Sequence, residues 1–103
     1  MYKILLTTTD KIEIVNKIKD YILKGKLSPC VQIIRGVESS YLWKEKVTTA
    51  KEYSILIKCK KNNLEKIKTF IQKEHNYDVC ELISTDMGIL NPLYKKWFDE
   101  NSI

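Results

Sequence analysis

The sequence predicts a single α+β domain whose elements follow one another as strand, helix, strand, strand, helix, strand, with a short helix at the end. Two observations predict this class. Apolar, β-branched segments of strand length alternate with segments whose apolar residues recur at helical spacing. The 103 residues also match the size of one domain, and no linker, repeat or low-complexity segment divides residues 1–103.

The first half of the chain predicts a strand, a helix and a second strand. Residues 2–8 (YKILLTT) are typical of a buried central strand. Asp10 stands three residues before Glu13, which is the spacing of a capping box, and Gly25 can end the helix that follows. The apolar face of this helix is expected to contain Ile14, Ile18, Tyr21 and Ile22. The second strand begins at Pro29.

The second half repeats the pattern of strand, helix and strand. In residues 53–59 the apolar side chains alternate with polar ones, as in a strand with one buried face. Asn62 or Asn63 is expected to cap the next helix. Its apolar stripe would contain Leu64, Ile67, Phe70 and Ile71. The fourth strand is expected at residues 79–84.

A short terminal helix completes the prediction. Asn91 followed by Pro92 combines a capping residue with a first-turn proline, and the helix is expected to reach Trp97. The order of elements is that of a ferredoxin-like βαββαβ sandwich, with two helices on one face of an antiparallel sheet. Many functions use this fold, so the fold alone does not identify one.

An extended arm is predicted between the second and third strands, at residues 36–47 (GVESSYLWKEKV). A tight hairpin needs two to five residues, whereas this segment has a dozen and keeps the alternation of a strand. Gly36 permits a bulge or bend where the arm leaves the sheet. An isolated two-stranded arm with Tyr41 and Trp43 needs a partner to cover it. The alternative is a long loop with two exposed aromatic residues.

Composition argues against a nucleic-acid partner. The net charge of +5 comes from 18 basic and 13 acidic residues, and every basic residue except Arg35 is a lysine. The lysines are scattered among acids, so we favour a solvated surface over a nucleic-acid footprint. The third strand also lacks the glycine-and-aromatic run of RNA-recognition domains.

The sequence also predicts where the protein is located and whether it is an enzyme. No apolar run approaches the roughly 20 residues of a membrane span, and the N-terminal residues show no cleavage site after an apolar core. The cysteines Cys30, Cys59 and Cys80 show no CxxC spacing. We expect a reduced, cytoplasmic protein without a membrane partner. The chain has one histidine and no sequence motif of a catalytic nucleophile, a catalytic zinc site or a phosphate-binding loop. We therefore expect that the protein is not an enzyme.

Four segments share one family pattern, in order, through residues 2–100: PCVQIIRGVESSYLWKEKV, YSILIK, HNYDVCEL and YKKW. Together they resemble the CutA family, also called divalent-cation tolerance proteins. The resemblance implies a ferredoxin-like homotrimer in which extended strands pair across subunits, so the arm would be a trimerisation device. It also implies a function in tolerance of divalent cations, copper among them.

The chain departs from the family pattern at several motif positions. These positions are Gln32, Arg35, Glu45, Asn76 and Cys80. Glu45 stands where the family has a glycine. The resemblance places the copper ligands of bacterial relatives at a cysteine and at adjacent histidines, and here Leu6 and Glu74 occupy two of those positions beside the single His75.

A copper site in this chain would have to gather its ligands around His75. We expect His75 with Cys80, Glu81 or Cys30 near a cleft, because copper and zinc sites take three or four ligands. A thiolate beside an imidazole favours copper over Mg²⁺, so weak or moderate copper binding is predicted. His75 is also typical of a surface or capping residue at a helix end. For Cys30 we favour a buried, small apolar residue over a ligand.

Six residues are expected at an inter-subunit interface or cleft: Tyr41, Trp43, Lys58, Tyr77, Tyr94 and Trp97. For Trp43, Trp97 and Tyr94 we favour a role as anchors of the interface or core over a role in stacking against a ligand. Lys58 fits a snorkelling lysine as well as a cleft cation. Three functions remain open: a trimer for cation tolerance, a trimer that binds a small ligand between subunits as the similar PII signalling proteins do, and an interaction or scaffold protein without a ligand.

Overall fold

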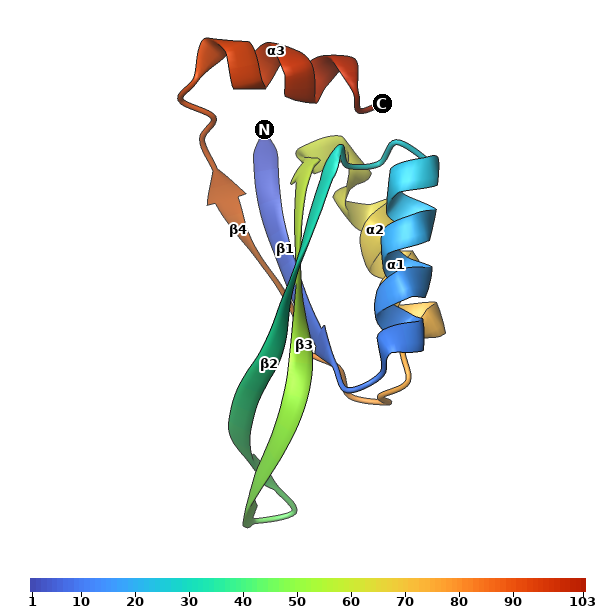
Figure 1. Ribbon diagram of the computed structural model, residues 1–103, viewed down its shortest axis with the longest axis vertical. Helices are drawn as coiled ribbons and strands as arrows, with labels where there is room; N and C mark the ends of the chain where they lie inside the picture. Colours follow the sequence, from blue (N-terminus) through green and yellow to red (C-terminus); the bar gives the residue numbers. More distant parts are fainter.

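The computed structural model describes residues 1–103 and contains a four-stranded antiparallel sheet and three α-helices (Figure 1). The elements are β1 (Tyr2–Thr9), α1 (Ile12–Lys24), β2 (Cys30–Trp43), β3 (Lys46–Lys60), a 3₁₀ turn (Lys61–Asn63), α2 (Leu64–Glu74), β4 (Leu82–Met87) and α3 (Pro92–Glu100). The strand order is β2-β3-β1-β4. The predicted α+β class and the order of elements are confirmed. None of the helices has the length and apolar character that a membrane crossing requires.

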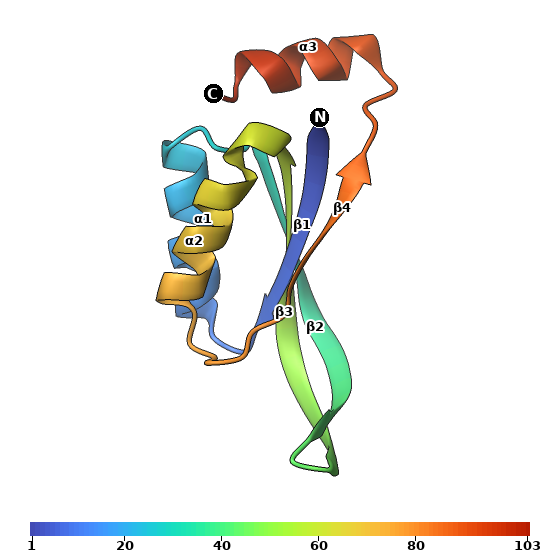
Figure 2. The ribbon, with the colours of Figure 1, turned by 180° about the vertical axis from the view of Figure 1, so that it is seen from behind.

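The hydrophobic core lies between the sheet and helices α1 and α2, which cover the same face (Figures 1 and 2). Alternate residues of β1 and β3 point toward the helices, so Leu5, Ile55 and Ile57 are buried there. Ile18 on α1 and Ile67 on α2 are fully buried against them. The apolar faces predicted for the third strand and for both helices are confirmed.

The predicted capping box of the first helix is wrong. Helix α1 begins at Ile12, its N-cap position is Lys11, and no side chain caps it. Asp10 is engaged elsewhere, because its carboxylate accepts a hydrogen bond of 2.8 Å from the Asn76 side chain. The Thr9 hydroxyl instead accepts the Lys11 N–H at 3.2 Å. Tertiary contacts therefore override the local signal.

Two other sequence predictions also need correction. Asn63 occupies the N-cap position of α2, but its side chain does not cap the helix. Its amide instead donates to the carbonyls of Leu27 and Ile103, at 3.1 and 2.8 Å. Strand β4 begins at Leu82, which pairs with Thr7, and not at residue 79. The chain before Leu82 crosses the end of β1 and joins the sheet only after that crossing.

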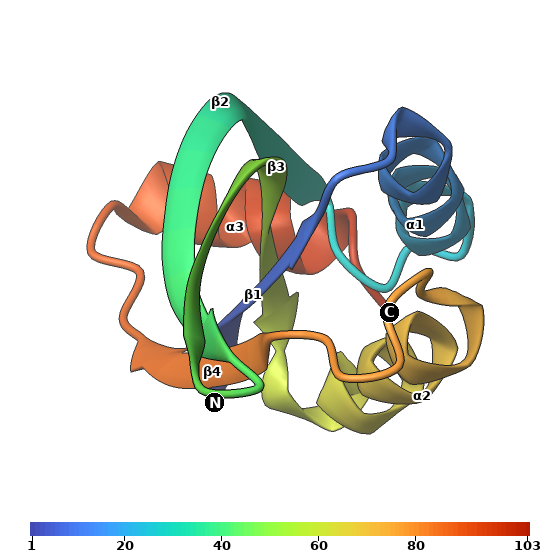
Figure 3. The same cartoon turned by 90° about the horizontal axis from the view of Figure 1, so that it is seen from below.

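The predicted arm is confirmed as a two-stranded extension of β2 and β3. Pairing continues from Val37 opposite Glu52 to the end of the hairpin, beyond a register shift at Gly36, whose φ is +68°. The hairpin closes through Lys44 and Glu45, both with positive φ. The arm projects from the end of the sheet opposite α3, which gives the chain extents of 46 × 24 × 22 Å (Figure 1). Seen from below, it curves away from α1 and α2 (Figure 3).

The sheet face opposite α1 and α2 carries no helix over its middle (Figures 1 and 2). Residues that alternate with the core positions lie on this face, so Ile34 on β2 and Ile83 on β4 are 53% and 58% exposed. Leu6 and Leu56, paired across β1 and β3, lie between them on the same face. We call this surface the open face. Its apolar character is unusual for a surface that stays in water.

Helix α3 covers one end of the sheet and begins as predicted. The Asn91 side chain accepts the backbone N–H groups of Leu93 and Tyr94, and Pro92 occupies the first turn. The helix extends to Glu100, past the predicted end at Trp97. Its anchor is Phe98, which is fully buried and meets the Tyr2 ring edge to face at 5.5 Å.

Candidate functional site

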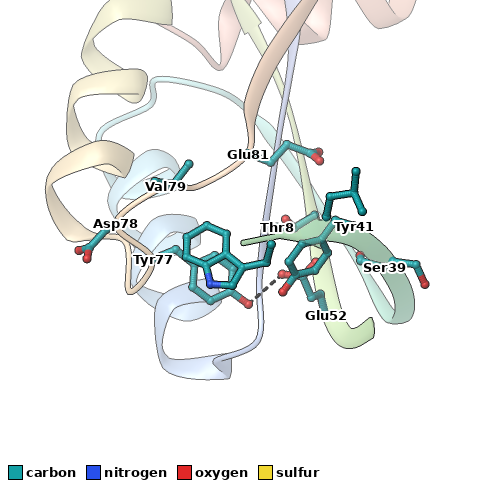
Figure 4. Close-up of a pocket in the computed structure, with 11 residues that line it drawn as sticks. Thr8, Ser39, Tyr41, Glu52, Tyr77, Asp78, Val79 and Glu81 are labelled. Atoms are coloured by element: carbon teal, nitrogen blue, oxygen red, sulfur yellow. Dashed lines mark hydrogen bonds between the residues drawn. The ribbon is translucent and has the colours of Figure 1, made fainter. Parts of the chain in front are cut away.

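A pocket of about 750 Å³ lies between the arm and the segment that precedes β4 (Figure 4). Residues 39–43 of the arm form one wall. Tyr77, residues 78–79 and Glu81 form the other wall. Thr8 at the end of β1 and Glu52 on β3 lie between them (Figure 4). The pocket exists because the bulge at Gly36 turns the arm out of the plane of the sheet.

Glu52 is the buried carboxylate of this pocket, with 7% of its surface exposed. It is the residue of β3 that pairs with Val37 immediately beyond the bulge. Its Oε2 accepts a hydrogen bond of 2.8 Å from the Tyr77 hydroxyl, drawn as the dashed line in Figure 4. Burial, and then the hydrogen bond and charge of Glu52, raise the pKa of Tyr77 far above its ordinary value. Tyr77 therefore remains a neutral hydrogen-bond donor to Glu52.

His75 fixes the chain that leads into the pocket wall. Its Nε2–H donates to the Thr8 carbonyl at 2.8 Å, and its Nδ1 accepts the Tyr77 backbone N–H at 3.0 Å. A carbonyl can only accept and a backbone N–H can only donate, so the ring is neutral and carries its proton on Nε2. Burial lowers the pKa of His75, against the opposing effects of the Thr8 hydrogen bond and of the charges on Glu52 and Asp10.

Asn76 adds a second connection between the same two segments. Its side-chain oxygen accepts a 2.6 Å hydrogen bond from the Thr9 hydroxyl, and its amide donates to Asp10. His75 and Asn76 are therefore held to the end of β1, and the Tyr77 side chain is held to Glu52 on β3. This explains why Tyr77 is positioned firmly enough to line a pocket.

The residues predicted as metal ligands do not fit a metal within one chain. No group of three or more His, Cys, Asp or Glu side chains is arranged to hold an ion. Both nitrogens of His75 are already used in hydrogen bonds. Cys80 is half-buried and Glu81 is exposed at the pocket, whereas Cys30 begins β2 at the far end of the sheet, beside Tyr94. A site completed by a second subunit stays a prediction.

The six predicted interface or cleft residues lie in three places. Tyr41, Trp43 and Tyr77 line the pocket together. Lys58 lies on β3 away from it, half-buried. Tyr94 and Trp97 lie on α3 with their rings 5.4 Å apart, and burial together with the Cys30 thiol raises the pKa of Tyr94.

Glu52 and Asp78 are the ionisable pocket residues that the sequence did not predict. Glu52 had one detectable signal, because it stands at the polar end of a strand in which Ser54 and Lys58 occupy the same face. Its pairing with Val37 beyond the bulge could not be predicted from the alternation alone. Asp78 lies in an irregular segment and has no periodic pattern to reveal its direction.

Neither the histidine nor the buried cysteine is set up for acid, base or nucleophilic chemistry. Both nitrogens of His75 are engaged with the backbone. Burial raises the pKa of the Cys59 thiol to about 11, so it persists as an inert thiol in the core.

Comparison with known proteins gives a consistent result over most of the chain. A family model described as "CutA1 divalent ion tolerance protein" matches residues 3–101. The chain is 30% identical to the divalent-cation tolerance protein CutA of Pyrococcus horikoshii over 99 residues, which is 96% of each. It is 33% identical to a protein CutA homolog of Xenopus laevis over 76 residues, 74% of this chain and 50% of that protein. The chain spans about half the length of the Xenopus and plant relatives that it matches.

A solved structure agrees in fold. The divalent cation tolerance protein (Cut A1) of Thermus thermophilus superposes with a TM-score of 0.91 at 27% sequence identity, covering 99% of both chains.

Proposed function

The chain belongs to the CutA1 divalent ion tolerance family, and on this basis we propose that it acts in tolerance of divalent cations as a homotrimer. The observation that carries the proposal is the family match over residues 3–101. Relatives from Thermus thermophilus and Pyrococcus horikoshii are named divalent-cation tolerance proteins and match almost their whole length.

The open face and the arm support the trimer. The arm exposes Leu42, Trp43 and Val47, with 75%, 50% and 77% of their surfaces in solvent, and the open face exposes Ile34 and Ile83. A two-stranded arm is marginally stable alone, and an exposed strand edge invites pairing with another chain. A closed ring of three chains would cover every copy of these surfaces.

The proposed role does not require a tight metal site inside one subunit. The side chains that could bind copper are separated or engaged, as described for His75. Copper bound by Cys80 and Glu81 together with residues of a neighbouring subunit remains the form of metal binding that we propose. The three free cysteines support a reducing, cytoplasmic location.

A growth assay tests the cation-tolerance role. The chain is expressed in a bacterial host from which its own CutA homologue has been deleted, and growth is measured across a range of Cu²⁺ concentrations. The proposal expects growth to recover relative to the empty vector. A Cys80→Ser variant tests copper binding through the thiol, and Cys59→Ser is the matched control in the core. No recovery at equal expression would contradict the proposal.

Light scattering on a sizing column tests the assembly. Three chains of 12.1 kDa give about 36 kDa. A stable species of one-chain mass at micromolar concentration would contradict the trimer.

Small-ligand binding is a second candidate function, and the pocket beside Glu52 favours it. Its volume lies within the roughly 300–1,000 Å³ that small-molecule sites occupy. A thermal-shift screen of cationic, neutral and anionic compounds tests it, because a ligand that binds the folded state raises the melting temperature.

A further inference from the structure

The pocket beside Glu52 has a charge opposite to that of the whole chain. The chain carries 18 basic and 13 acidic residues, yet no lysine, arginine or histidine lines the pocket. Its ionisable carboxyl groups belong to Glu52, Asp78 and Glu81. A concave surface lined by one sign of charge concentrates ions of the other sign. The pocket therefore favours a cation.

Glu52 lacks a cationic partner inside the chain. Its one side-chain hydrogen bond comes from the neutral Tyr77 hydroxyl, which contacts Oε2. The ion pairs of the chain join Lys3 to Asp86, Lys17 to Glu74 and Lys68 to Glu65, and none includes Glu52. A buried carboxylate is costly unless its charge is paired. Its Oε1 is left to accept a donor from the pocket.

Aromatic side chains provide the second recognition element. Tyr41 on the arm remains 43% exposed, and it lines the same pocket as Tyr77. The faces of tyrosine and tryptophan rings attract cations through their quadrupoles, and the rings also pack against carbon chains. Figure 4 shows Tyr41 on the arm side of the pocket and Tyr77 on the opposite side, with Glu52 between them.

The arrangement suits an organic cation and does not suit a metal ion. A metal ion needs several ligand atoms that converge on one position, and the carboxylates of this pocket do not converge in this way. A volume of about 750 Å³ is also far larger than an ion and matches a small molecule. Apolar walls contribute nothing to a bare metal ion, whereas they would bury an alkyl chain.

We propose that this pocket binds a small primary alkylammonium ion, with an N–H donating to Glu52 and the carbon chain packed against Tyr41 and Tyr77. In a diamine, the second ammonium group lies at the rim, near the exposed carboxylate of Glu81. The inference rests on the small-ligand candidate and is independent of the cation-tolerance role.

Calorimetry on the intact, assembled protein tests the inference. The probes are n-butylammonium chloride, with one charge, 1,4-diaminobutane dihydrochloride, with two, and n-butanol as a neutral control of similar length. We expect the diamine to bind more tightly than the monoamine, and n-butanol not to bind. Added NaCl should weaken the binding of both amines, because the rim carboxylates are open to solvent.

Matched variants locate the binding. Glu52→Gln keeps the shape and an acceptor for Tyr77 but removes the charge, so amine affinity should fall at least about tenfold. Glu38→Gln removes the same charge from an arm residue that does not line the pocket, and should leave affinity unchanged. Glu81→Gln, at an exposed position, should weaken the diamine and spare the monoamine. This last variant keeps the test decisive if Glu52→Gln fails to fold.

The outcomes separate this inference from the general small-ligand function. If a neutral or anionic compound raises the melting temperature and millimolar amines do not bind, the alkylammonium proposal is wrong while the small-ligand function stands. If nothing binds, both are wrong. Equal amine affinity in wild type and Glu52→Gln, with Glu81→Gln also unchanged, would place binding outside the pocket and overturn the inference.

Discussion

Replacing Glu45 by glycine should stabilise the protein, although no side-chain contact is gained. Lys44 and Glu45 close the arm hairpin with φ values of +50° and +66°. In this left-handed region a residue with a Cβ costs about 1–2 kcal/mol, and glycine avoids the cost. Glycine also makes the unfolded chain more flexible, which costs about 0.4–1 kcal/mol. The net gain in the free energy of unfolding is therefore about 0.5–1 kcal/mol per chain.

Urea unfolding measures this change. With a slope of about 1–3 kcal/mol per molar urea, the midpoint should rise by about 0.4 M, with the slope unchanged. Gly36→Ala is the matched control, because Gly36 has a φ of +68° and an added Cβ would meet no heavy atom within 4 Å. It should lower the midpoint by a similar amount through the backbone alone. A midpoint for Glu45→Gly that stays constant or falls would refute the reasoning.

Three further perturbations test other parts of the structure. Trp43→Ala should weaken the trimer by about 2 kcal/mol, seen as dissociation on dilution and as a midpoint that depends more steeply on concentration. Burial lowers the pKa of His75, so its contribution to the free energy of unfolding is complete above the unfolded-state pKa of about 6.5 and is lost as the pH falls below that value. His75→Gln should therefore reduce the loss of stability at low pH, measured by urea unfolding at a series of pH values. Asn63→Ala leaves the carbonyls of Leu27 and Ile103 without their amide donor and should cost about 1–3 kcal/mol by thermal unfolding. Asn62→Ala, at an exposed position of the same turn, should be near neutral.

The parts of the fold that the sequence predicted well are those set by local periodicity. The buried faces of α1, α2 and β3 follow from side-chain spacing, and the cap at Asn91 depends on atoms within three residues of it. The bulge at Gly36 follows from one flexible residue inside an alternating run. None of these features depends on a distant segment, so a short stretch of sequence contains the information.

The errors arose where a distant partner competes for a local signal. Asp10 has the spacing of a helix cap but is held by Asn76, 66 positions away. Asn63 has the composition of a cap but holds the end of the chain through Ile103. The early start predicted for β4 fails because His75 and Asn76 bind the end of β1 first. Such contacts cannot be predicted from the spacing of residues that are close in the sequence.

The same competition explains why the pocket was harder to predict than the fold. The resemblance to the CutA family pointed to residues 74–81 as a source of metal ligands. In this chain the single histidine of that segment holds the Tyr77 backbone, and Tyr77 in turn holds Glu52. The segment therefore shapes a wall of the pocket, and the charge of the pocket comes from Glu52 on another strand. Because His75 supports the wall and Glu52 lies on another strand, no local sequence motif marks the pocket.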